Sequence, residues 1–225
     1  MNRILWAVIL TFVIVILILQ LERLRRRTEE QLRRVLYMEK NPKLYLQLLE
    51  NRHLRLLFSE ASLQHMRLQA YLVQEQDAAC EQLFRQLDGR HLPRGERIEY
   101  AAEKLQYYTQ RKQTEPARQA LAEIHALIKD GASEKDLAIR EDADMICRVY
   151  IEKDASAIPV LQEQLKTQGN YMRAVSLYRM ARLYHAGGND PQAQDCLEKA
   201  LPLSKGGTYE KLIAQSLRNL SLLDE

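Results

Sequence analysis

Residues 177–200 read LYRMARLYHAGGNDPQAQDCLEKA, and their spacing predicts two helices joined by a tight turn. In the first half, Leu177, Met180, Ala181 and Tyr184 follow the i, i+3, i+4, i+7 pattern of a single helix face. An apolar face of this kind has to pack against another element. The rest of this stretch supplies the partner.

The second half begins with a stop signal and a start signal in direct succession. Gly187-Gly188 ends the first helix, because glycine is favoured just past a helix C-terminus. Asp190 is the expected cap of the next helix, and Pro191 fits its first turn. The second apolar stripe consists of Ala193, Leu197 and Ala200. Small residues on both stripes predict a closely packed antiparallel pair.

The pattern recurs upstream. At an offset of 34 residues, the four positions of the first stripe hold Ala143, Ile146, Cys147 and Tyr150. Farther upstream, Tyr108 precedes Ala117 by the nine residues that separate Tyr184 from Ala193. A fainter pair lies around Tyr71 and Ala79.

The pattern Leu-x2-Met-Ala-x2-Tyr, eight residues, Ala-x3-Leu-x2-Ala resembles a tetratricopeptide repeat, whose period is 34 residues. The resemblance implies an all-α superhelix of about four helix pairs and a capping helix. The repeat-like domain is expected over residues 41–225. Its clearest repeats are expected at 96–130, 134–168 and 171–204, with the cap at 208–222.

Nearer the N-terminus, helices are expected at about 42–57, 60–74 and 76–88. Asn41-Pro42 is a clear start signal for the first of them. No Gly or Pro occurs between Lys43 and Gly89, so the boundaries in this part of the chain are poorly determined.

The N-terminal segment has a different character. Residues 4–19 carry no charge, and residues 4–21 would form about 27 Å of helix, close to the thickness of a bilayer core. They predict a transmembrane anchor after a short N-tail at 1–3. A cleaved signal peptide is the alternative, but no small-x-small cleavage site follows the apolar run.

Residues 22–40 predict a basic juxtamembrane helix or stalk. Residues 21–40 contain seven bases against four acids, which favours a cytoplasmic C-terminal domain by the positive-inside rule. An inverted anchor with an extracytoplasmic domain is the alternative. Membrane headgroup contacts are expected from Arg23, Arg25, Arg26 and Arg27.

The same segment has a ragged apolar stripe. It would allow a homodimeric coiled coil through residues 21–40. A lone stalk packed against its own domain or the headgroups is the alternative, and it fits the two polar interruptions better. The rest of the chain, without this segment and Arg3, has 25 bases and 26 acids, which speaks against a nucleic-acid partner.

Signals for catalysis are missing from the sequence. The five histidines have no metal-ligand spacing, and the three cysteines lie far apart within expected helices, where a free thiol packs as a small apolar group. The acids Glu141, Asp142 and Asp144 diverge around one helix and predict a solvated face. We therefore expect no enzyme, no metal and no cofactor.

The resemblance implies that the first helix of each pair lines a concave groove that binds a protein or peptide. Tyrosine and arginine are common interface anchors, although a solvated groove without such anchors is the alternative. The expected groove residues are Tyr178, Arg182, His185, Arg148, Asp144 and Gln106.

Together these features predict a membrane-anchored helical-repeat adaptor or scaffold that holds a partner at the cytoplasmic face. A structural, oligomerising component of a membrane complex is the second hypothesis. The partner itself cannot be read from the sequence.

Overall fold

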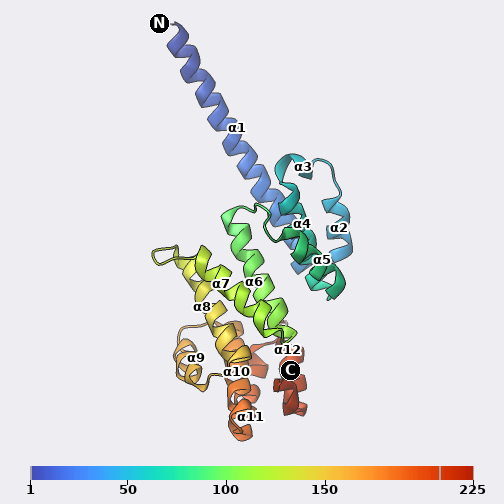
Figure 1. Cartoon of the computed structure of the whole chain (residues 1–225), viewed down its shortest axis with the longest axis vertical. Helices are drawn as coiled ribbons and strands as arrows, with labels where there is room; N and C mark the ends of the chain where they lie inside the picture. The colour runs from blue at the N-terminus through green and yellow to red at the C-terminus, as the bar shows by residue number, and fades with distance from the viewer. Residues whose placement is uncertain (1, 208, 225) are drawn as a thin grey trace. The chain divides into compact units, whose positions relative to one another are not determined.

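The computed structural model describes the backbone of residues 2–207 and 209–224, and of residues 2–5 and 7 it describes no side chain. Within these ranges the chain is helical and contains no strand, as the ribbon in Figure 1 illustrates. The all-α prediction is confirmed. Met1 of the expected N-tail and residue 208 of the expected cap lie outside the described residues.

The chain divides into two compact units, residues 1–97 and 98–225, with the division inside helix α6 (Arg94–Gln110). Unit 1 contains α1 (Asn2–Arg33), the π-helical turn η1 (Arg34–Met38), α2 (Pro42–Leu49), α3 (Leu54–Leu57), α4 (Glu60–Val73) and α5 (Asp77–Leu87). Unit 2 contains α7 (Thr114–Leu127), α8 (Glu134–Ile146), η2 (Cys147–Ile151), η3 (Ala155–Ala157), α9 (Ile158–Gln164), α10 (Asn170–Ala186), α11 (Asp190–Ala200), η4 (Leu201–Leu203), α12 (Tyr209–Arg218) and η5 (Leu220–Asp224).

The C-terminal part of α1 packs into the core of unit 1. Leu32 and Leu36, from α1 and η1, are buried with residues of α2 and α4. These two leucines belong to the stripe that a coiled coil would need, and they are covered by their own unit. A dimer through residues 21–40 would therefore have to use Leu21 and Leu24, which are exposed.

The expected helix at 42–57 is wrong in one respect, because the chain turns between α2 and α3. The Asn51 side chain accepts a hydrogen bond from the backbone N–H of His53, 3.0 Å long, which stabilises the turn. Asparagine competes with helical hydrogen bonds in this way. The short helix α3 is the result. By contrast, α4 and α5 lie within one residue of the helices expected at 60–74 and 76–88.

Helix α10 is the centre of unit 2. All ten residues from 174 to 183 are buried, so this helix is covered on every side. Helix α11 packs tightly against it, and Ala181 and Ala193 are both fully buried. The small residues allow the close helix approach that the sequence predicts.

Three helix pairs are joined by the same turn. In each, a tyrosine carbonyl accepts a hydrogen bond from the N–H five residues later, and the residue before that N–H has a positive φ. This is a helix C-terminus of the Schellman type. The tyrosines are Tyr71, Tyr108 and Tyr184, and the positive-φ residues are Glu75, Lys112 and Gly188.

In each of the three pairs, a fully buried small residue follows the tyrosine by nine positions. These residues are Cys80, Ala117 and Ala193. The first pair is therefore aligned on Cys80, one residue after the Ala79 suggested by the sequence. Ala79 is only half-buried.

Two other helix ends use a different geometry. Here the last turn is π-helical, and the N–H that closes it bonds to the carbonyl six residues earlier: Asn41 to Val35 (3.1 Å) and Asp154 to Arg148 (2.8 Å). Lys40 and Lys153 hold the positive φ. Along the sequence, Ala157 follows Tyr150 by seven residues, whereas Ala193 follows Tyr184 by nine. In the repeat expected at 134–168, the return helix consists of the short elements η3 and α9.

The C-terminal elements α12 and η5 belong to the core of unit 2. Ile213 is fully buried and Leu223 nearly so, and both pack with residues of α10 and α11. The segment expected as a cap is thus integrated with the last pair rather than laid loosely over it.

Candidate functional site

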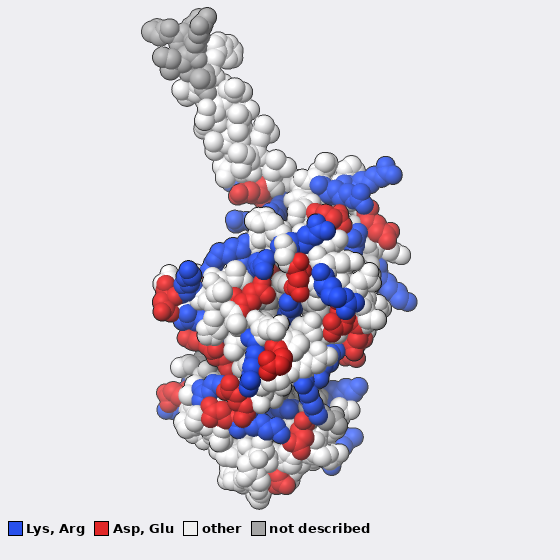
Figure 2. All heavy atoms as spheres, in the orientation of Figure 1, with Lys and Arg blue, Asp and Glu red and all other residues white. Residues whose placement is uncertain are grey.

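The N-terminal half of α1 exposes its apolar side chains in every direction. From Val8 to Leu19, the only residue that is not a large hydrophobic is Thr11, and the exposed fractions of the large hydrophobic residues lie between 40% and 66%. Trp6 is 69% exposed. Figure 2 shows this part of α1 as an uncharged rod. No side of it packs on unit 1.

Over the residues whose side chains are described, no helix is both long enough and apolar enough to cross a membrane. Ile4, Leu5 and Ala7 of the anchor expected at 4–21 lie outside those residues.

Arginines follow the apolar run within one turn. Arg23, Arg26 and Arg27 are exposed, whereas Arg25 is half-buried and forms an ion pair with Glu96. The Arg25 guanidinium also lies over the Phe58 ring, 5.4 Å from its centroid. Of the four expected headgroup residues, three are therefore free to meet an anionic surface, and Arg25 fixes α1 to unit 1.

A shallow surface hollow lies where the apolar run of α1 gives way to the arginines. Its apolar lining comes from the last turns of the uncharged run, and its cationic lining from the first arginines. The lining residues are Leu17, Gln20, Leu21, Arg23, Leu24 and Arg27.

The expected groove residues of α10 lie inside the core of unit 2. Tyr178 is 1% exposed, and its ring meets that of Tyr209 edge-on with centroids 5.5 Å apart. Arg182 is 8% exposed and lies over the Tyr150 ring, 4.6 Å from its centroid. It also donates a hydrogen bond to Tyr178. In this conformation neither side chain is available to a partner, because other elements of the same unit cover both.

Arg179 adds a second buried cation to this cluster. Its guanidinium donates a 2.7 Å hydrogen bond to Asp142 of α8, and its side chain is 7% exposed. Burying an arginine is costly unless a carboxylate compensates its charge. Asp142 is that carboxylate.

Burial changes the acidity of the tyrosines around these arginines. Desolvation raises the pKa of Tyr150, Tyr178 and Tyr209 above the ordinary value, and the neighbouring guanidinium groups only partly oppose it. Tyr150 and Tyr209 also share a hydrogen bond. The cluster is therefore held together by neutral phenols, two cations and one acid, all of which have partners within unit 2.

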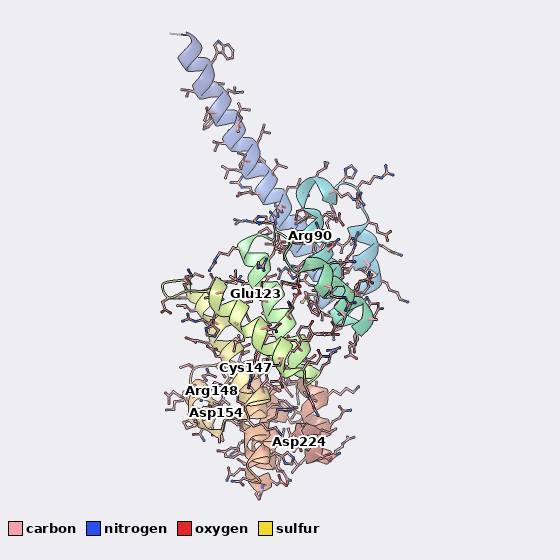
Figure 3. All side chains as sticks on the ribbon, viewed as in Figure 1. Arg90, Glu123, Cys147, Arg148, Asp154 and Asp224 are labelled. Atoms are coloured by element: carbon pink, nitrogen blue, oxygen red, sulfur yellow. The ribbon has the colours of Figure 1, made fainter. Side chains whose placement is uncertain are left out.

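The remaining expected groove residues are more exposed, and most are paired. Arg148 donates a 2.9 Å hydrogen bond to Asp154, and Figure 3 shows the two side chains close together. Asp144 is paired with His125 at 2.7 Å. His185 is bonded through Nδ1 to Asp190 at 2.6 Å. Gln106 is exposed on α6.

The acidic group of α8 illustrates what sequence reasoning missed. Asp142 and Asp144 were expected on a solvated face, but they bond to different elements, α10 and α7.

Within residues 2–207 and 209–224, no three His, Cys, Asp or Glu side chains are arranged to hold a metal ion. The three cysteines are free and buried, as the sequence predicts. Desolvation raises the pKa of the Cys147 thiol and raises that of Cys196 to about 11, so neither favours the reactive thiolate.

Two candidate regions therefore remain, namely the apolar half of α1 with its arginines, and the outer surface of the helix pairs. Comparison of the chain with known protein families, curated proteins and solved structures found no match.

Proposed function

We propose that this chain is a membrane-anchored helical-repeat scaffold. The N-terminal half of α1 inserts into a bilayer, and the helical units bind a protein or peptide partner at its cytoplasmic face. The proposal includes no catalytic step.

The exposure of α1 on all sides carries the proposal. A helix that is apolar around its whole circumference is stable where apolar material surrounds it, in a large core or in a bilayer. A groove on a protein partner would cover only one stripe of such a helix. Burying one Leu, Ile or Val side chain contributes about 1.5–3 kcal/mol, so the exposed residues from Val8 to Leu19 represent a large driving force for insertion.

The position of the arginines supports the direction of insertion. Arg23, Arg26 and Arg27 lie on the side of the apolar run that faces the helical units, and positive residues stay on the cytoplasmic side. The anionic cytoplasmic leaflet attracts each of them by about 1 kcal/mol.

The recurrence of one turn supports a repeat architecture. Tyr71, Tyr108 and Tyr184 each occupy the same position relative to a positive-φ residue and a buried small residue. Repeats of this kind bind partners through exposed faces. Gln106 of the expected groove is exposed, as are Tyr171 and Met172 at the start of α10, so these are the accessible positions for contact.

The anchor is tested by floating the full chain with phosphatidylcholine vesicles on a density gradient in 1 M salt. Salt at this concentration reduces the Debye length to about 3 Å and removes attraction between arginines and headgroups. We expect the chain to float with the vesicles. Recovery in the vesicle-free fractions would contradict the proposal.

Partner binding is tested separately by affinity capture from membranes. The exposed positions are changed in the variant Tyr171→Ser/Met172→Ser, and Lys205→Ser serves as an exposed control on the same unit. We expect loss of a stoichiometric partner in the first variant only. If the Tyr171→Ser/Met172→Ser variant captures the same proteins as the natural chain, this face is excluded as the partner-binding surface.

A further inference from the structure

Helix α3 presents a basic and apolar turn whose orientation is fixed by the core of unit 1. Leu54 and Phe58 are buried at 7% and 4% exposure, and they lie four residues apart on one side of the turn. Leu56, two residues after Leu54, therefore points the opposite way and is 80% exposed. It is a large apolar side chain held out in solvent by a rigid support.

The same turn carries exposed arginines. Arg52 precedes His53, Arg55 precedes Leu56, and both arginines are exposed. A hydrogen bond from the Phe58 N–H to the Leu54 carbonyl, 2.8 Å long, closes the turn and holds this arrangement. No acid occurs between Asn51 and Phe58.

This turn lies at the level where the uncharged run of α1 ends. Arg25 of α1 stacks on Phe58, the residue that closes α3, and in Figure 1 α3 lies beside α1 at this point. In Figure 2, Lys and Arg side chains lie around the base of the uncharged rod, with Asp and Glu side chains among them. Arg52 and Arg55 of α3 thus add to the charge of Arg23, Arg26 and Arg27 near the end of the apolar run. The exposed acids nearest to these arginines in the sequence are Glu22, Glu30, Glu50 and Glu60.

We propose that α3 is a second membrane-contact element, in which Leu56 enters the interface of an anionic bilayer while Arg52 and Arg55 contact lipid phosphates. This inference rests on the proposed anchoring of α1. Charge complementarity and continuity with the anchor select a lipid surface, because a residue at this level of a membrane-inserted α1 faces headgroups. The contact fixes unit 1 against the bilayer, which a single helix would leave free to tilt.

The natural chain has one tryptophan, Trp6, so Trp6→Phe/Leu56→Trp places a sole fluorophore at the end of the α3 turn. Val73→Trp in the same Trp6→Phe background is the matched control. Val73 is also an exposed apolar residue of unit 1, but it lies at the far end of α4, about 20 Å along that helix from its start beside Phe58.

Both full-length variants are reconstituted into vesicles of phosphatidylcholine with about one third phosphatidylglycerol, with lipids brominated near the headgroup as quenchers. We expect the tryptophan at position 56 to be quenched several-fold more than that at position 73. Adding Arg52→Gln/Arg55→Gln is expected to weaken association of the turn roughly 25-fold, because each arginine near an anionic surface contributes about fivefold.

Flotation of the same samples separates the two levels of the proposal. Vesicle-bound protein with equal quenching at positions 56 and 73 overturns the role of α3 and leaves the anchor intact. Equal quenching at position 56 with and without phosphatidylglycerol overturns the role of the arginines. Protein that does not float overturns the anchor, and with it the inference.

Discussion

Helix α10 and the N-terminal half of α1 are alike in sequence character and opposite in environment. Neither has one apolar face and one polar face. Residues 174–183 of α10 are buried on every side by unit 2, whereas the large hydrophobic residues from Val8 to Leu19 of α1 are exposed on every side. A helix without a polar face needs an apolar environment, and only α10 finds it within the chain.

The polar residues of the two helices explain this difference. Ser176, Arg179 and Arg182 are buried in α10, and each has a hydrogen-bonding or ring partner on a neighbouring residue. A protein core can supply such partners to a buried polar group, whereas hydrocarbon cannot. The apolar run of α1 contains no charge from Ile4 to Leu21, which fits hydrocarbon rather than a core.

The largest expected effect comes from placing charge in the middle of α1. In Val13→Asp/Ile16→Asp, each aspartate costs about 2.5–3.5 kcal/mol at the centre of a bilayer. We expect the chain to be lost from floated vesicles, while the thermal unfolding of unit 2 stays unchanged. Ile16→Leu is the control. If the double variant floats with the vesicles as well as the natural chain does, the claim that α1 needs a bilayer, as α10 needs the core of unit 2, is contradicted.

The next effect comes from removing the partner of a buried charge in α10. Asp142→Ala leaves Arg179 without a carboxylate, and we expect a loss of about 2–3 kcal/mol in the free energy of unfolding, reduced from the fully buried case because Asp142 is half-exposed. Denaturant titration measures it. Asp144→Ala, which removes an exposed pair with His125, should cost less than about 1 kcal/mol. Equal losses would mean that Asp142 does not compensate Arg179.

A similar but smaller loss is expected where α10 and α11 meet. Ala193→Leu inserts a larger side chain where no space exists, at a cost of about 1–3 kcal/mol. Ala186→Leu adds the same atoms at an exposed position near the end of α10 and should change stability by about 0.5 kcal/mol or less. Thermal denaturation of the two variants is the measurement. An Ala193→Leu protein as stable as the natural chain would contradict the close approach of the pair.

The smallest expected effect is on the pH dependence of stability, and it is absent at neutral pH and appears only in alkali. Because the pKa values of Tyr150, Tyr178 and Tyr209 are raised in the fold, the unfolded chain loses phenolic protons first, above about pH 10. Stability is therefore unaffected below pH 10 and falls above it, by up to about 1.4 kcal/mol per pH unit for each tyrosine still protonated in the fold.

Circular dichroism with denaturant at several alkaline pH values measures this slope, and Tyr150→Phe should reduce it. The α1 segment from Asn2 to Arg33 has no tyrosine, so flotation of the chain should not change over the same range. A slope of stability that is identical in Tyr150→Phe would show that this phenol titrates alike in the folded and unfolded states.

Much of the fold could be predicted where local signals coincide. The turn between α10 and α11 could be predicted because Gly188, which has a positive φ, directly precedes a capped helix start. The cap itself is Asn189, whose side chain accepts a hydrogen bond from the Gln192 N–H, and not the expected Asp190. The spacing of Tyr108 and Ala117 predicts the same turn with Lys112 in the glycine position. The break near Asn51 had no such signal, because one side-chain hydrogen bond decides it.

The candidate site was less accessible to sequence reasoning. The stripe of Leu177, Met180, Ala181 and Tyr184 predicts one apolar face of α10, and the resemblance to a known repeat implies that Tyr178 and Arg182 lie in an outer groove. Their burial depends on Tyr150 and Tyr209, which come from distant parts of unit 2. The exposure of Leu56 likewise depends on long-range packing, because Leu54 and Phe58 are the residues of this turn that are buried in the core of unit 1. Long-range packing of this kind leaves no local pattern.

Trp6 offers the most direct test of the anchor, since it is the sole tryptophan and lies in the apolar run. In vesicles containing the natural full-length chain, its fluorescence is measured with lipids brominated in their acyl chains and, separately, with iodide in the aqueous phase. The account predicts strong quenching by the brominated lipids and little by iodide, because Trp6 lies at the edge of the hydrocarbon. Full quenching by iodide with none by the brominated lipids would contradict it.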